Sequence, residues 1–195
     1  MRVYALSVAY TPSENFPELI DSMKRAAGAL RDAGVPHLLG GGLAAWARGG
    51  PPTEHDVDFF VLPADAERAL DALIEAEMKP ERPPEGWLLK AWDGETLIDL
   101  IFSPMGGDVD QGFFDRAKEM EVAAQRLHVA SLGDVLATKL LALNEQEPDL
   151  ASVLEMARSL REQIDWDFVR ARTDSSPFAL AFFTLVEELG VVDAA

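Results

Sequence analysis

Three aspartates occupy segments that are otherwise apolar. Asp56 and Asp58 alternate with apolar residues in the run 56–62, and Asp99 stands in the middle of the apolar segment 97–102. Residues two apart in a strand point to the same face, so the first two carboxylates lie roughly 6.5 to 7 Å apart along the chain. An ionised carboxylate in such surroundings carries a large desolvation cost unless it is paired or binds a metal. These positions are therefore candidates for a metal site.

A divalent cation is the simplest partner for Asp56, Asp58 and Asp99, because few lysines or arginines lie near them in the sequence. Carboxylate and water ligands suit Mg²⁺ or Mn²⁺ better than Zn²⁺, and the chain has no cysteine and only three histidines. We predict that the three aspartates bind Mg²⁺ or Mn²⁺. Two other interpretations stay open: the paired acids cap a turn, or the three form a purely structural metal site.

A glycine run lies upstream of the first two aspartates. Gly41 and Gly42 follow an apolar strand expected at 37–39 and precede an Ala-rich segment that favours helix. Glycine lets a phosphate approach the main chain, and the N–H groups of a helix start attract it. We expect Gly41 and Gly42 to hold nucleotide phosphates, although a tight turn would also explain them. Arg48 is a candidate for neutralising phosphate charge, or else a solvated residue at the helix end.

The predicted elements alternate between helix and strand in the first two thirds of the chain and are helical afterwards. Asp93-Gly94 between two apolar runs indicates a hairpin, and Gly34 ends the first helix. The fold class is thus α/β (α+β), a mixed sheet flanked by helices with a C-terminal helical subdomain. Strands are predicted over 1–10, 37–39, 56–62, 87–92, 96–102 and 126–130, and helices over 16–33, 43–48, 64–78, 113–120, 131–143, 149–163, 166–171 and 178–189. Loops are predicted over 80–86 and 105–110.

The segment 39–44, the pair Asp56 and Asp58, and Asp99 together resemble the DNA polymerase beta-like nucleotidyltransferase superfamily. That family has an apolar strand, a Gly-Gly or Gly-Ser pair, an Asp-apolar-Asp motif and a third acidic residue on a later strand. The small bacterial members are the most similar: minimal nucleotidyltransferases, AbiEii-type toxins and antibiotic adenylyltransferases. The resemblance covers about residues 35–102, with a weaker continuation over 134–160.

The resemblance implies a role for each motif residue. Asp56 and Asp58 would bind metal, and Asp99 would help to activate the acceptor hydroxyl. Lys139, in the apolar segment 138–143, would contact the triphosphate or shape the site. The change to helical periodicity near residue 130 divides the chain into a domain over 1–130, which the resemblance identifies as the nucleotidyltransferase domain, and a helical subdomain over 131–195.

The sequence departs from the family pattern at two places. The family often has Thr or Ser two residues before the first aspartate, where this chain has Glu54, with Thr53 one residue further back. We therefore regard Thr53 as a candidate nucleotide contact whose role stays open. A second Asp often follows the one that matches Asp149, and here that position is Ser152.

Composition and charge restrict the partners. The 195 residues carry a formal net charge of -17 and include 48% hydrophobic residues, which fits a globular protein with a real core. A surface so acidic repels phosphate backbones and anionic lipid, which argues against broad nucleic-acid or membrane binding. Without cysteine, a signal-like N-terminus or a membrane span, the expected location is the cytoplasm.

We therefore interpret the sequence as a metal-dependent enzyme that moves a nucleoside monophosphate from an NTP, with ATP as the expected donor, to an acceptor hydroxyl. A small cationic molecule or a protein fits the charge better than tRNA as acceptor. The alternative is a non-catalytic nucleotide-binding module, such as a toxin–antitoxin component with a helical protein partner. Three buried like charges argue against that alternative, because a binding module has little reason to keep them.

Overall fold

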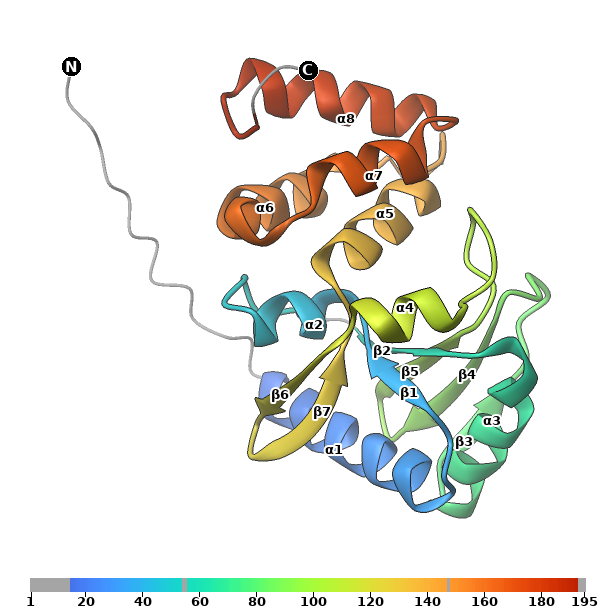
Figure 1. Cartoon of the computed structure of the whole chain (residues 1–195). Helices are drawn as coiled ribbons and strands as arrows, with labels where there is room; N and C mark the ends of the chain where they lie inside the picture. Colours follow the sequence, from blue (N-terminus) through green and yellow to red (C-terminus); the bar gives the residue numbers. More distant parts are fainter. Residues whose placement is uncertain (1–14, 54–55, 147, 193–195) are drawn as a thin grey trace.

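A mixed seven-stranded sheet carries the three aspartates in the computed structural model, which describes residues 15–53, 56–146 and 148–192 (Figure 1). The strand predicted over 1–10 lies outside these residues. The order is β3-β4-β5-β2-β1-β7-β6. β2 is parallel to β5, and β1 is parallel to β7, whereas the other neighbours are antiparallel. The strands are β1 (His37–Leu39), β2 (Asp56–Val61), β3 (Lys79–Glu81), β4 (Leu88–Asp93), β5 (Thr96–Ile101), β6 (Lys118–Val122) and β7 (Gln125–Val129).

The central strands are apolar on both faces because helices cover both. α1 (Phe16–Asp32) and α3 (Ala66–Glu75) pack against one face, and α2 (Gly41–Ala47) and α4 (Gln111–Arg116) lie on the other (Figure 1). α1 is amphipathic and ends as predicted before Gly34, whose φ of +65° favours glycine. A short 3-10 turn (Pro63–Asp65) leads into α3. The α/β fold class with a mixed sheet is confirmed.

The C-terminal helices α5 (Leu132–Ala142), α6 (Leu150–Leu160), α7 (Trp166–Thr173) and α8 (Pro177–Glu188) stack beyond α2 and α4 (Figure 1). A second 3-10 turn (Arg161–Gln163) follows α6. Each of the four helices begins at a residue whose side chain accepts a backbone N–H, which stabilises helix starts. These caps are Ser131, Asp149, Asp165 and Ser176. The division into 1–130 and 131–195 stays a prediction.

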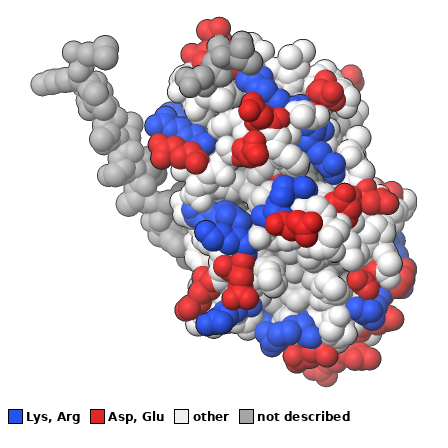
Figure 2. Space-filling model, viewed as in Figure 1, with Lys and Arg blue, Asp and Glu red and all other residues white. Residues whose placement is uncertain are grey.

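Three elements differ from the sequence prediction. The helix expected over 113–120 ends at Arg116, and Lys118–Val122 instead forms the edge strand β6. Lys79–Glu81, at the start of the expected proline-rich loop, pairs with β4. The turn between β4 and β5 is Gly94-Glu95 rather than Asp93-Gly94, because Asp93 pairs with Thr96. No helix among the described residues has the length and apolar character needed to cross a membrane. Basic and acidic side chains lie interspersed over the face of the molecule that Figure 2 shows.

Candidate active site

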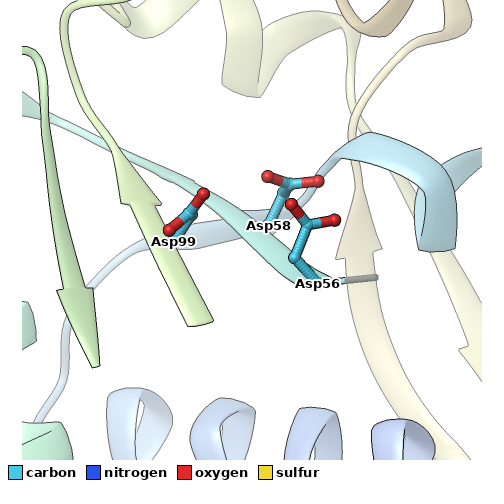
Figure 3. A group of neighbouring side chains, drawn as sticks. All are labelled: Asp56, Asp58 and Asp99. Carbon is cyan, nitrogen blue, oxygen red and sulfur yellow. The ribbon is translucent and has the colours of Figure 1, made fainter. Parts of the chain in front are cut away.

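The register of β2 and β5 brings the three aspartates together. Asp58 lies opposite Asp99 in the parallel pair, and Asp56 is two residues before Asp58 on the same face. A carboxylate oxygen from each lies within 4.8 Å of one from each of the others. Figure 3 shows the three side chains rising on the side of the sheet away from α1. The predicted cluster therefore forms from two strands that are 40 residues apart in sequence.

Burial and mutual repulsion destabilise the charged forms of two of these carboxylates. Asp58 is 9% exposed and Asp99 8%. Burial, followed by the charge of Asp56, raises the pKa of Asp58 to about 8, while Lys139 acts in the opposite direction. Burial raises the pKa of Asp99 to about 6, against the attraction of Lys90. Lys90 and Lys139 offset only part of this cost, and a bound cation would stabilise the charged carboxylates further.

Gly41 and Gly42 lie against the cluster and its neighbouring loop. Gly41 has a φ of +51°, and a Cβ built on it would lie 1.6 Å from Asp58 Oδ2. A Cβ on Gly42 would lie 2.5 Å from Thr53 Oγ1. Both positions therefore require glycine because any side chain there would collide with Asp58 or Thr53. The sequence alone did not reveal this reason for the two glycines. Among the predicted nucleotide contacts, Thr53 and Gly42 are therefore neighbours.

A pocket of about 480 Å³ opens over the aspartates. One side consists of α5 residues, including Thr138 and Lys139, and another carries Glu85, Trp87 and Met105. Gly41 and the three aspartates belong to its lining, so five of the eight predicted site residues line one pocket. The pocket is large enough for a small organic molecule beside the carboxylates.

The structure places Arg48 elsewhere. Its guanidinium Nη2 donates hydrogen bonds to the carbonyls of Val129 (3.1 Å) and Ala130 (2.9 Å), and its own carbonyl accepts one from Gln163. Arg48 does not line the pocket over the aspartates. These hydrogen bonds of Arg48 connect the C-terminal end of α2 to the chain at the end of β7. Asp149, whose role the sequence left open, caps α6 through the N–H groups of Ala151 and Ser152.

Lys90 is the polar neighbour that the sequence prediction did not include in the site. It lies opposite Asp99 in the β4–β5 hairpin, and its Nζ is 3.5 Å from Asp99 Oδ1. That oxygen is buried and accepts no hydrogen bond from any described residue. A buried acceptor with one lone cation nearby is a suitable ligand atom for a metal.

The family comparison agrees with this geometry. Residues 19–178 match the model of a family described as "Nucleotidyl transferase of unknown function (DUF2204)". The chain belongs to this nucleotidyl transferase family. The resemblance to the nucleotidyltransferase superfamily is thereby confirmed, and the protein is a nucleotidyltransferase. No curated protein matches the sequence.

Solved structures share the fold of this nucleotidyl transferase at low sequence identity. The solution structure of the antibiotic-resistance factor ANT(2″)-Ia is 13% identical, with a TM-score of 0.63 over 89% of this chain and 98% of that one. A crystal structure of ANT(2″)-Ia in complex with adenylyl-2″-tobramycin is 13% identical, with a TM-score of 0.52 over 87% of this chain and 98% of that one. A candidate nucleotidyltransferase from Thermotoga maritima is 16% identical, with a TM-score of 0.53 over 75% and 92%.

Proposed function

We propose that this nucleotidyl transferase uses a divalent metal, Mg²⁺ or Mn²⁺, to move a nucleoside monophosphate from an NTP to a hydroxyl of a small molecule. ATP is the proposed donor. The observation that carries the proposal is the cluster of three carboxylates, with oxygens within 4.8 Å of one another, in the wall of a pocket. In this reaction the acceptor oxygen bonds to the α-phosphorus, the bond from that phosphorus to the β-phosphate oxygen breaks, and pyrophosphate leaves.

Asp56, Asp58 and Asp99 fit the metal. The donors are all carboxylate oxygens, the ligands that Mg²⁺ and Mn²⁺ prefer. Burial is the main cause of the raised pKa values of Asp58 and Asp99, and Asp99 Oδ1 accepts no hydrogen bond from the described residues. A bound cation would stabilise these carboxylates and neutralise charge on the triphosphate.

The remaining residues position substrate and proton. Asp99 is the proposed acceptor of the hydroxyl proton, because its side chain faces the pocket and its pKa of about 6 keeps it largely ionised near pH 7. Lys139, on the opposite wall, is the proposed partner of the triphosphate. Gly41 and Gly42, at the start of α2, are proposed to present backbone N–H groups to the phosphates. Thr53 is proposed to act through its contact with Gly42.

The acceptor is proposed to be a small molecule that carries an amine. Glu85, Trp87 and Met105 line the pocket beyond the aspartates, and Lys139 is the one cationic residue among those that line it. A glutamate and a tryptophan suit an ammonium group, whereas an RNA backbone would meet a chain of net charge -17. The small-molecule product held by ANT(2″)-Ia supports an acceptor of this size.

The test is transfer of label from α-phosphate-labelled ATP, with Mg²⁺ or Mn²⁺, to a panel of amine-bearing alcohols, proteins and RNA. We expect label on a small molecule with stoichiometric pyrophosphate release, and loss of both in Asp58→Asn and Asp99→Asn. Asp21→Asn, an exposed aspartate of α1, is the control. Nucleotide binding without transfer would support the non-catalytic module, and a metal-dependent melting temperature without any nucleotide effect would support a structural metal.

A further inference from the structure

A second pocket, of about 390 Å³, lies at the far end of β1 from Gly41. β1 and β2 are antiparallel, with His37 opposite Val61 and Leu39 opposite Phe59, so the aspartate cluster is at one end of β1 and His37 at the other. We call this hollow the basic pocket, because four basic side chains line it: Arg31, His37, Arg126 and His128. They come from α1, β1 and β7.

His37 interacts with residues in and around the basic pocket. His37 packs edge-on against Phe59, with ring centroids 5.5 Å apart, and its Nδ1 lies 2.8 Å from the carbonyl of Val35. Donation from Nδ1 to that carbonyl makes Nε2 of the neutral ring a hydrogen-bond acceptor rather than a donor. Burial lowers the pKa of His37, and the charges of His128 and Arg31 lower it further. These groups are therefore close enough to repel one another.

Carboxylates of the chain neutralise the basic pocket poorly. Arg31 pairs with Asp32 at 3.5 Å, and Arg126 pairs with Glu119 at 3.9 Å. In both ion pairs, the acidic and the basic side chain are each more than half exposed. Such exposed ion pairs contribute little. In a chain with twice as many acidic as basic residues, two arginines and two histidines around one hollow remain without a strong partner.

We propose that the basic pocket is a binding site for the phosphate group of a small molecule, separate from the proposed NTP site. A phosphate group offers charged oxygens to the two guanidinium forks and to His128, and the O–H of its singly protonated form donates to Nε2 of His37. The hollow is larger than a single phosphate, so it leaves room for the group to which the phosphate is attached. Glu119 also lines the hollow, and its carboxylate opposes the binding of any anion. This site does not depend on the proposed function.

The three histidines of the chain give a direct test. Imidazole resonances of the full-length protein are followed by NMR during titration with inorganic phosphate, at constant pH and ionic strength. EDTA is present so that no metal carries phosphate to the aspartates. We expect saturable shifts for His37 and His128 and none for His55, which adjoins Asp56 in sequence. Shifts that do not saturate, or shifts confined to His55, would overturn the proposal, as would a stronger response to acetate than to phosphate.

Charge removal provides the second measurement. In Arg31→Gln combined with Arg126→Gln, phosphate affinity should fall about tenfold or more, because hydrogen bonds to charged groups are the strong ones. Arg161→Gln is the control, since Arg161 is exposed and pairs with its exposed sequence neighbour Glu162 at 3.8 Å, as Arg31 pairs with Asp32. Equal affinities in the double variant and the control would refute the site. The NMR test uses the unaltered chain and does not depend on these variants folding.

Discussion

The Asp58 carboxylate fills the space that a side chain at Gly41 would need: a Cβ on Gly41 would lie 1.6 Å from Asp58 Oδ2. The first turn of α2 therefore presses on the central member of the acidic cluster. Gly40 reinforces the contact, because its N–H donates to the Asp58 carbonyl at 2.8 Å. The glycine run thus fixes where the Asp58 carboxylate points.

Gly41→Ala should displace the Asp58 carboxylate and reduce nucleotidyl transfer about a hundredfold, since small misplacements of reacting groups cost that much. The positive φ adds about 1 to 2 kcal/mol of backbone strain. Gly190→Ala is the control: its φ is +65°, but no atom lies within 4 Å of the new Cβ. It should lose similar stability and keep full activity. Equal activity in both variants would contradict the proposed contact.

Stability without metal should fall as pH rises from about 5 to 8. The unfolded chain releases the Asp58 proton near pH 3.8, whereas the folded state holds it up to about 8. The folded state then binds more protons in this interval, so the free energy of unfolding decreases with pH, by an amount on the order of a few kcal/mol. Asp99, with a pKa of about 6, adds to the slope below pH 6.

The measurement for this prediction is urea denaturation in EDTA across that pH range. Asp58→Asn should flatten the curve and be more stable than the wild type at pH 8. Asp21→Asn, at an exposed position of α1, should retain the wild-type slope. Parallel curves for the wild type and Asp58→Asn would show that the Asp58 carboxylate is not the source of the slope.

Lys90 should compete with a metal for Asp99, because its Nζ lies 3.5 Å from Asp99 Oδ1. Lys90→Gln removes that like charge from the cation's surroundings, so Mg²⁺ or Mn²⁺ binding should tighten about threefold to tenfold. The readout is the melting temperature as a function of metal concentration. Lys24→Gln, on the exposed face of α1, should leave the metal affinity unchanged. Weaker binding in Lys90→Gln would mean that Lys90 supports the metal site instead.

The sequence predicted the acidic cluster because each aspartate stands out against apolar neighbours. It did not predict Lys90 as a member, because that depends on the hairpin register. A turn at Asp93-Gly94 would place Lys90 opposite Leu97, whereas the actual turn at Gly94-Glu95 places it opposite Asp99. A shift of one residue in a turn thus changes which charge lies beside the proposed base. The role of Arg48 also depends on distant residues, since the carbonyls that it binds, those of Val129 at the end of β7 and Ala130 directly after it, are more than 80 residues away in sequence.

Most predicted helices and strands agree with the structure where periodicity was strong, and β6 shows why others do not. In Lys118–Val122 the apolar residues alternate with charged ones, as in an edge strand. The hairpin to β7 nevertheless escaped prediction, because its turn consists of Ala123 and Ala124 at φ values of +49° and +65°. Such turns are usually Asn-Gly. Tertiary packing, rather than turn chemistry, holds this hairpin.

That turn can be improved. Val122 pairs with Gln125, so Ala123 and Ala124 form a two-residue turn with positive φ at both positions. Ala123→Asn combined with Ala124→Gly should raise the free energy of unfolding by about 1 kcal/mol, measured by urea denaturation. The reverse change in the other hairpin, Gly94→Ala at a φ of +63°, should lower it by a similar amount. A double variant less stable than the wild type would argue that the alanines are not strained.

Arg116 on α4 and Asp134 on α5 form an ion pair between a partly exposed arginine and a buried aspartate, which connects the helices that cover the sheet to the C-terminal ones. Asp134 accepts hydrogen bonds from Arg116 Nε (3.0 Å) and Nη2 (2.7 Å) and from Ser131 Oγ (2.6 Å). Its side chain is 0% exposed, and the guanidinium lies 4.7 Å from the ring centroid of Phe168 on α7. The same helix α5 carries Lys139 into the pocket. The pair therefore positions one wall of the site.

Asp134→Asn should lower the free energy of unfolding by about 1 to 3 kcal/mol, because it removes the charge of a fully buried carboxylate that accepts three hydrogen bonds, while the partly exposed Arg116 keeps access to water. Glu67→Gln is the control: Arg82 also donates two hydrogen bonds to Glu67, at 2.6 and 2.7 Å, but through Nη1 and Nη2, and both side chains are more than half exposed. Solvent screens that pair, so its loss should hardly change the denaturation midpoint. The expected difference comes from the burial of Asp134 and from its additional hydrogen bond with Ser131 Oγ. Equal losses in the two variants would show that Asp134 does not owe its importance to its buried environment.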